Sequence, residues 1–362
     1  MSRLLVIAAG GTGGHMYPAQ ALAEAMLSRG WRVRLATDAR GLRYAGGFPD
    51  AVDRLELRAA SPGQGGLTGL LAAPTTLARG MIQAARAFRR DPPALVAGFG
   101  GYPAFPTLAA AVGMGLPRII HEQNGVLGRV NRFFARHAAV VACGIWPLEN
   151  APARARLEHV GNPVRSAVIE ASATPYDPPA RGPLRLLVFG GSQGASVFAT
   201  LVPAAVTSLP EAMRHRLTVV QQIRGDEGAA VEAAYRGAGV EAETAPFFED
   251  MPTRLAEAHL VISRAGASTV AELAIMGRPS ILVPYPHATA DHQSANARAL
   301  GAAAAAIVVR EAALTTSDLA AHIRTCLAQD RATEMAKAAR AIARPNAVTQ
   351  LAKMVETHAR PQ

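Results

Sequence analysis

The same short pattern occurs twice in this chain of 362 residues, and it limits the folds that the chain can adopt. An apolar run ends in paired glycines, a hydroxyl residue and further glycine follow, and a helical stretch begins. The first copy is LLVIAAGGTGG at residues 4–14, and the second is LLVFGGSQG at residues 186–194. A buried strand that turns through glycines into a helix is the opening unit of a doubly wound α/β domain. The repeat therefore predicts two similar domains that face each other across a cleft.

Short apolar runs bounded by glycine or proline recur in each half, and the run at 184–189 includes the start of the second copy. They are residues 32–36, 94–97, 118–120 and 139–142 in the first half, and 184–189, 217–221, 259–263 and 280–284 in the second. Helices are expected between them, including 18–29 and 127–137, and in the tail from residue 318 onward. This alternation is typical of parallel sheets covered on both faces. The proline-rich segment 175–183 indicates a linker.

Composition narrows the class of protein. Half of the residues are hydrophobic, which excludes a disordered chain. Two cysteines cannot form a disulfide framework, which favours a reducing compartment. The uncharged stretch between Asp91 and Arg118 is interrupted repeatedly by proline and glycine, so we expect no membrane span, and the N-terminus shows no signal peptide. The net charge of +10 suits nucleic acid, an anionic membrane face or phosphate-bearing substrates, although a coding bias towards arginine would also produce it.

The two glycine loops are candidate anion sites, because glycines allow close approach to a ligand and the following helix starts offer N–H groups. His15 stands where a dinucleotide site has its third glycine, and neither loop has the GK[ST] of a P-loop. The alternative is a tight turn needed only for packing. Ser192 adds a hydroxyl to the second loop, residues 190–195.

Two later loops also follow apolar runs. In residues 263–272, Glu272 lies one turn into an expected helix, where a carboxylate could accept both hydroxyls of a ribose, and a capping box with Ser268 is the alternative. In residues 284–293, the polar side chains could address sugar hydroxyls. A metal site there is disfavoured, because no cysteine or further carboxylate supports it.

In the first half, polar residues 121–124 (His-Glu-Gln-Asn) follow an apolar run, and 98–103 is another loop of this kind. No Gly-x-Ser-x-Gly elbow supports a hydrolase. Arg129, Arg132 and Arg136 share one helical stripe, and leucines of residues 67–81 lie beside arginines of residues 79–90. Basic plus apolar suits a membrane interface, and an ordinary solvated face is the alternative.

Together, seven segments resemble the MurG family of peptidoglycan glycosyltransferases, in order and over nearly the whole chain. They are residues 10–15, 100–102, 121–124, 161–165, 190–195, 263–272 and 291–293. The resemblance implies a GT-B fold with an acceptor and membrane-associating domain at 1–163, a UDP-GlcNAc-binding domain at 164–340, and a C-terminal helix at 341–362 that packs back on the first domain.

The implied activity is that of an inverting hexosyltransferase in peptidoglycan synthesis. It moves N-acetylglucosamine from UDP-GlcNAc to the C4 hydroxyl of N-acetylmuramic acid in undecaprenyl-pyrophosphoryl-MurNAc-pentapeptide, converting lipid I to lipid II. No cofactor, metal or nucleic acid is implied. The expected location is the cytoplasmic face of the bacterial inner membrane, as a peripheral protein that touches anionic lipid and joins cell-wall synthesis complexes.

The resemblance also assigns residues. The acceptor would meet Thr12, Gly13, Gly14 and His15, and the donor sugar would meet Asn124 and Gln293. Ser192 would hold the pyrophosphate, the Phe248 backbone the uracil and Glu272 the ribose, with Arg165 nearby and Ala267, Ser268, Thr269, Val270 and Ala271 lining the site.

An inverting displacement needs a base for the acceptor hydroxyl and a positive field for the departing UDP. His15 is the first candidate base and Glu122 the second. A UDP-sugar epimerase of the same fold is the alternative function, and a dinucleotide oxidoreductase is disfavoured by the irregular first loop.

Overall fold

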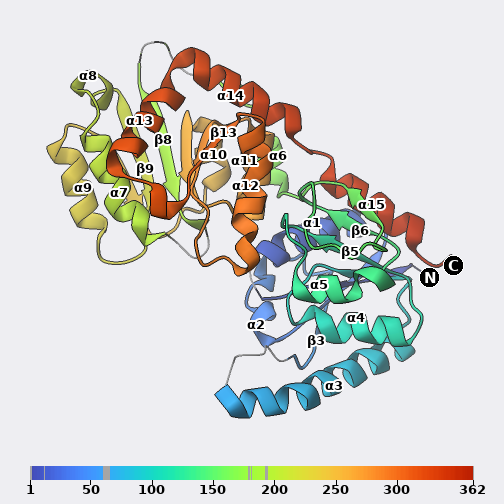
Figure 1. The fold of residues 1–362 in the computed structure, drawn as a ribbon. Coiled ribbons are helices and arrows are strands. Elements are labelled where there is room, and N and C mark those ends of the chain that lie inside the picture. Colours follow the sequence, from blue (N-terminus) through green and yellow to red (C-terminus); the bar gives the residue numbers. More distant parts are fainter. Residues whose placement is uncertain are drawn as a thin grey trace. The chain divides into compact units, whose positions relative to one another are not determined.

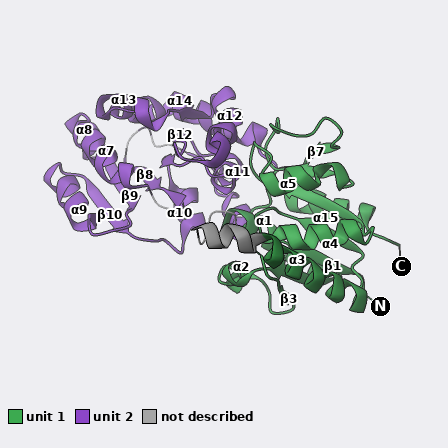
Figure 2. Ribbon diagram, turned by 60° about the horizontal axis from the view of Figure 1, so that its bottom comes forward, with its two compact units in different colours: residues 1–165, 345–362 green, residues 166–344 purple. Residues whose placement is uncertain are grey.

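The computed structural model describes residues 2–11, 13–59, 66–177, 180, 182–191 and 195–361, with the backbone alone for 66–73. The chain forms two compact units (Figure 2). Unit 1 comprises residues 1–165 and 345–362, and unit 2 comprises residues 166–344. Both units are α/β structures built on a fully parallel sheet, as the repeated glycine pattern predicts.

The sheet of unit 1 has seven strands in the order β3-β2-β1-β4-β5-β6-β7, of which β3, β5 and β6 are labelled in Figure 1. The strands are β1 (Leu4–Ala8), β2 (Arg32–Thr37), β3 (Asp53–Glu56), β4 (Leu95–Gly98), β5 (Arg118–Glu122), β6 (Val141–Cys143) and β7 (Leu157–His159). The helices are α1 (Gly13–Ser28), α2 (Ala39–Leu42), α3 (Gly66–Arg90), α4 (Ala104–Gly113), α5 (Arg129–Phe134) and α15 (Ala347–His358).

Strand β1 shows why this sheet needs a helix layer on each face. Leu5 and Ile7 face one core with α1 and α15, whereas Leu4 and Val6 face a second core with α3 and α4. Side chains alternate along a strand, so an uninterrupted apolar run buries both faces of the sheet. Leu351 of α15 is fully buried in the first core, so the last helix of the chain is part of unit 1.

The sheet of unit 2 has six strands in the order β10-β9-β8-β11-β12-β13. The strands are β8 (Leu184–Phe189), β9 (Leu217–Gln222), β10 (Glu241–Ala245), β11 (Leu260–Ser263), β12 (Ser280–Leu282) and β13 (Ala306–Val308). The helices are α6 (Ser166–Ala171), α7 (Ser196–Thr207), α8 (Glu211–Arg214), α9 (Gly228–Gly237), α10 (Met251–Glu257), α11 (Ala267–Met276), α12 (His292–Ala302), α13 (Thr316–Leu327) and α14 (Gln329–Ile342).

In each unit the strand order reverses beside the first strand, which places a switch point between β1 and β4 in unit 1 and between β8 and β11 in unit 2. Open parallel sheets bind ligands at the carboxyl ends of the strands at such points. Four of the loops singled out in the sequence follow these four strands, namely residues 10–15, 98–103, 190–195 and 263–272. No helix in the described part of the chain is long and apolar enough to cross a membrane.

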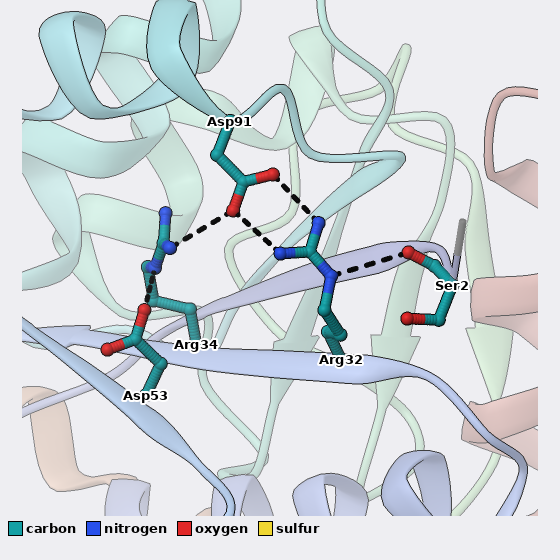
Figure 3. A network of polar contacts seen from close by, with 5 residues as sticks. All are labelled: Ser2, Arg32, Arg34, Asp53 and Asp91. Atoms are coloured by element: carbon teal, nitrogen blue, oxygen red, sulfur yellow. Dashed lines mark hydrogen bonds and ion pairs between the residues drawn. The ribbon is translucent and has the colours of Figure 1, made fainter.

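An ion-pair network lies at the amino ends of strands β2 and β3 of unit 1 (Figure 3). The two terminal guanidinium nitrogens of Arg32, Nη2 and Nη1, donate to Asp91 at 2.8 and 3.0 Å. Arg34 donates to Asp91 at 3.1 Å and to Asp53 at 2.6 Å. The hydrogen bond from Arg32 is the first cause that lowers the pKa of the Asp91 carboxyl. The network joins the starts of β2 and β3 to the residue that follows α3.

We predict that Asp91→Asn lowers the thermal unfolding midpoint by about 2–4 °C, because a partly exposed network of this kind contributes about 1 kcal/mol. The pKa of Asp91 is lower in the folded chain than in the unfolded chain. Its stabilisation is therefore complete above the unfolded value and is lost as the pH falls through the folded value. Thermal melts of the variant and the unaltered protein should differ at pH 7 and converge as the pH falls through the folded pKa of Asp91. The exposed Asp50→Asn is the control, and an equal shift in both variants would contradict the prediction.

Candidate active site

In unit 1 the loops after β1 and β4 pack against each other so closely that only glycines fit. A Cβ at Gly101 would lie 2.4 Å from the Gly10 carbonyl oxygen, and one at Gly10 would lie 2.6 Å from the Pro103 ring. Gly101 also has φ +77°, in the left-handed region that favours glycine. The glycines at this switch point therefore serve loop packing as well as any ligand.

His15 lies in the first turn of α1 and is half-buried. A Cβ at Gly100, where φ is +90°, would lie 3.2 Å from the imidazole of His15 and 3.0 Å from the Asn131 amide nitrogen. The loop after β4 thus brings the His15 ring and the start of α5 to one place at the sheet edge. Gly13 and Gly14 begin α1 beside His15, and Thr12 lies outside the described residues.

His121 and Glu122 are the last two residues of β5, so the polar segment is partly strand and not wholly the loop that its composition suggested. Both side chains are 1% exposed. Burial lowers the pKa of His121 to about 4, so its imidazole is neutral at pH 7. Burial also disfavours the charged form of Glu122 and so raises its pKa, whereas hydrogen bonds from Gly128, Asn131 and Asn124 lower it.

Arg165 ends the first segment of unit 1, residues 1–165, and its guanidinium lies 5.6 Å from the ring centre of Tyr17 on α1. Asn124 is half-buried beside Glu122. These two predicted residues therefore belong to the same unit as His15.

In unit 2 the loop after β11 leads directly into α11. Gly266 is the N-cap, with no side-chain cap, so Ser268 is inside the helix and the capping-box alternative is wrong. Ser268, Thr269, Ala271 and Glu272 form a half-exposed face, whereas Ala267 and Val270 point into the core. The six predicted residues thus divide into an accessible face and a packing face.

The side chains of α12 hold this loop in place. Gln293 accepts hydrogen bonds through Oε1 from the N–H groups of Ala265, at 3.1 Å, and Tyr285, at 2.9 Å. Asn296 donates to the Ala265 carbonyl at 3.0 Å. Any contact of Gln293 with a ligand would therefore come from its amide nitrogen. Asn296 was missed in the sequence, although it lies one turn after Gln293 on the same helix.

Arg264 was also missed. It is 6% exposed and donates to the carbonyls of Val283 and Pro284 while pairing with Glu311. Its guanidinium lies 5.2 Å from the Phe198 ring centre and 5.4 Å from that of Tyr285. Arg264 therefore joins the loops that follow β11 and β12 to helix α7.

Phe248, predicted at the uracil, is 5% exposed, and the Arg254 guanidinium lies 4.2 Å from its ring centre. The hydrogen bond that Arg254 donates to Glu243 is the first cause that raises the pKa of Arg254, and its hydrogen bond to Asp250 also raises it. Arg254 thus fixes the segment that carries Phe248. Ser192 lies outside the described residues, and the loop before it is held by Gln222, which accepts from the Gly190 N–H at 3.3 Å.

The predicted basic stripe lies on one surface of unit 1. Arg129, Arg132 and Arg136 line a shallow pocket with Phe133 and Pro152. Phe133 is 58% exposed. Within the described residues, no three His, Cys, Asp or Glu side chains are grouped so that they could hold a metal ion.

We predict that Gly100→Ala lowers the thermal unfolding midpoint by several degrees, because strained backbone and crowding against His15 and Asn131 cost about 1–3 kcal/mol. Gly113→Ala is the matched control, since a Cβ at this helical position meets nothing within 4 Å. Its expected effect is neutral or slightly stabilising. Equal midpoints for the two variants would show that the loop tolerates a side chain at residue 100.

Comparison with known proteins relates both units to glycosyltransferases. Residues 5–143 match the glycosyltransferase family 28 N-terminal domain, and residues 185–353 match the family's C-terminal domain. A protein of Caulobacter vibrioides, named as a UDP-N-acetylglucosamine–N-acetylmuramyl-(pentapeptide) pyrophosphoryl-undecaprenol N-acetylglucosamine transferase, is 51% identical over 99% of this chain and 100% of its own length. A protein of Brucella abortus with the same name is 47% identical, over 98% of this chain and 93% of its own.

Among solved structures, MurG of Acinetobacter baumannii has a TM-score of 0.81 at 31% identity, covering 98% of this chain and 99% of that one. The GT-B type expected from the sequence is therefore confirmed for the two Rossmann-like units.

Proposed function

The chain belongs to glycosyltransferase family 28, and on that premise we infer that it transfers N-acetylglucosamine from UDP-N-acetylglucosamine to undecaprenyl-pyrophosphoryl-N-acetylmuramyl-pentapeptide. The observation that carries this function is the match at 51% identity to a relative named for the same reaction, over 99% of this chain. It is a reaction of peptidoglycan synthesis. The comparisons give the epimerase alternative no support.

We propose that unit 2 binds the donor. The half-exposed face of α11 suits a nucleotide, because Glu272 is its carboxylate and the helix start supplies N–H groups. In this proposal Glu272 accepts the ribose hydroxyls, Ser192 contacts the pyrophosphate and the backbone of Phe248 contacts the uracil. Gln293, held by two backbone N–H groups, offers its amide nitrogen to the sugar.

Unit 1 would bind the acceptor beside His15. The C4 hydroxyl oxygen attacks the anomeric carbon of the donor, and its proton passes to the imidazole of His15. The bond from the anomeric carbon to the phosphate oxygen breaks as the new glycosidic bond forms, and UDP leaves from the opposite face with inversion. A histidine suits this step, because imidazole is the side chain that most often acts as a general base in enzymes.

The direct test is transfer of labelled N-acetylglucosamine to a lipid I analogue. We expect His15→Ala to lower kcat by about 10²- to 10⁴-fold with little change in KM for UDP-GlcNAc, as loss of a general base would. Glu272→Gln should instead raise that KM by about 10-fold, through loss of charge-assisted hydrogen bonds.

Each variant is the control for the other, since one addresses the proton and the other the nucleotide. Absence of product from the unaltered protein, with UDP-GlcNAc still bound, would overturn the proposed function. Normal turnover by His15→Ala would show that His15 is not the base, and it would leave the proposed transfer reaction standing.

We also propose that unit 1 rests on an anionic membrane through the arginine-lined surface of α5. Three arginines line the same pocket as an exposed aromatic ring, Phe133, which suits lipid phosphates beside an inserted apolar side chain. Ile82 of α3 is 51% exposed and adds to the apolar surface of the unit. The side chains of Leu67, Leu70 and Leu71 lie outside the described ones, so Phe133 is the better residue to test.

Phe133→Ser should weaken binding to phosphatidylglycerol vesicles by about 5- to 10-fold, because it removes the aromatic ring that would insert into the lipid. Co-sedimentation at low and high salt measures this, and the arginines should make the binding salt-dependent. Ile169→Ser removes an apolar side chain that is 37% exposed on α6 of unit 2 and serves as control. Equal binding by the two variants would place the membrane contact elsewhere.

A further inference from the structure

The carboxylate of Glu122 is fully occupied by the protein. Its Oε1 accepts hydrogen bonds from Asn124, at 3.1 Å from the backbone nitrogen and 3.2 Å from the side-chain amide. Its Oε2 accepts from the Gly128 N–H and from the Asn131 amide, both at 2.9 Å. All four partners are N–H donors, and the side chain is 1% exposed. The four hydrogen bonds favour an ionised carboxylate and so oppose the burial that raises its pKa, and they leave little room for a substrate hydroxyl.

A general base must come within hydrogen-bond reach of the proton that it removes. We propose that Glu122 is a positioning residue of the transfer reaction, which holds Asn124 and the start of α5, and that it takes no proton from the acceptor. This inference rests on the proposed function. Gly128 fits the same arrangement, because a Cβ there would lie 3.3 Å from Oε2 of Glu122.

Asn131 is the step between Glu122 and His15. Its amide nitrogen donates to Glu122 and, at 3.2 Å, to the His121 carbonyl. The same amide lies against Gly100, whose other neighbour is the ring of His15. A displaced Asn131 would therefore disturb the loop that packs on His15. Glu122 acts on the reacting groups through this amide and through Asn124.

The neighbours of Glu122 on β5 hold a different segment. Nε2 of His121 lies 3.3 Å from the Gly161 carbonyl, and the Asn162 amide donates to the Gln123 carbonyl at 2.8 Å. A Cβ at Gly144 would collide with the Asn162 side chain, so that residue lies in a closely fitted position. The end of β5 thus fixes both the start of α5 and the segment that leads to Arg165.

The test is the pH profile of kcat/KM for Glu122→Gln in the lipid I transfer assay. The amide group of the new glutamine would face N–H donors, so we expect kcat/KM to fall by about 10-fold. The acid limb of the pH profile should keep the midpoint that it has in the unaltered enzyme. Loss of the acid limb in Glu122→Gln would overturn the proposal, because the limb would then belong to Glu122. Glu158→Gln, which alters an exposed carboxylate on β7, is the control and should match the unaltered enzyme.

A second variant, Asn131→Ala, keeps the carboxylate and removes one of its donors. Its loss of activity should agree with that of Glu122→Gln to within about threefold. The double variant should lose no more activity than either single variant, because both changes break the same contact between Asn131 and Glu122. Additive losses would overturn the proposal where both variants fold, and full activity in Asn131→Ala would overturn it even where Glu122→Gln does not fold. No transfer by the unaltered protein would instead count against the proposed function.

Discussion

Parallel strand pairing is the constraint on which both units depend. Parallel neighbours cannot be joined by a hairpin, so every connection crosses a face of the sheet and all carboxyl ends meet at one edge. In unit 1 this brings the loops after β1 and β4 together, with the Gly10 carbonyl 2.4 Å from where a Cβ of Gly101 would be. Loops that approach so closely require glycine. The glycine pattern is therefore a property of the fold first, and the fold then makes that edge available for chemistry.

The central strands could be predicted from the sequence, and the edge strands could not. Residues 4–8 and 184–189 form strands where the sequence shows apolar runs, because a largely apolar run at the centre of a sheet has few alternatives. The edge strands β3, with the sequence DRLE, and β10, with EAETA, are polar since one side of each meets solvent. The helix predicted over 127–137 is shorter than its pattern. Gly128 caps α5 at its start, and a 3-10 turn follows Phe134.

The site shows the same division. The segments singled out in the sequence lie at the carboxyl ends of parallel strands, since polar residues after apolar runs mark these ends. The sequence could not tell which side chains turn inward, because that depends on the residue at which a strand or helix begins or ends. β5 continues through Glu122 and encloses its carboxylate, and α11 starts at Ala267 and turns Val270 into the core. Asn131 belongs to no motif in the sequence. Only the structure shows that its amide donates to Glu122 and to the His121 carbonyl.

The route of the chain between the units adds a last constraint, seen within unit 2. The chain enters unit 2 at residue 166 and leaves it after residue 344. Arg340, close to the exit, donates to the carbonyls of Ser172 and Thr174, close to the entry, and buried Arg278 also donates to Thr174. Gly277, at φ +63°, makes room for Arg340, since a Cβ there would lie 2.6 Å from its side chain. The entry and exit of unit 2 are therefore tied to each other, so neither can shift alone. A sequence search for catalytic motifs does not detect such a tie, because its acceptors are backbone carbonyls, which every residue carries.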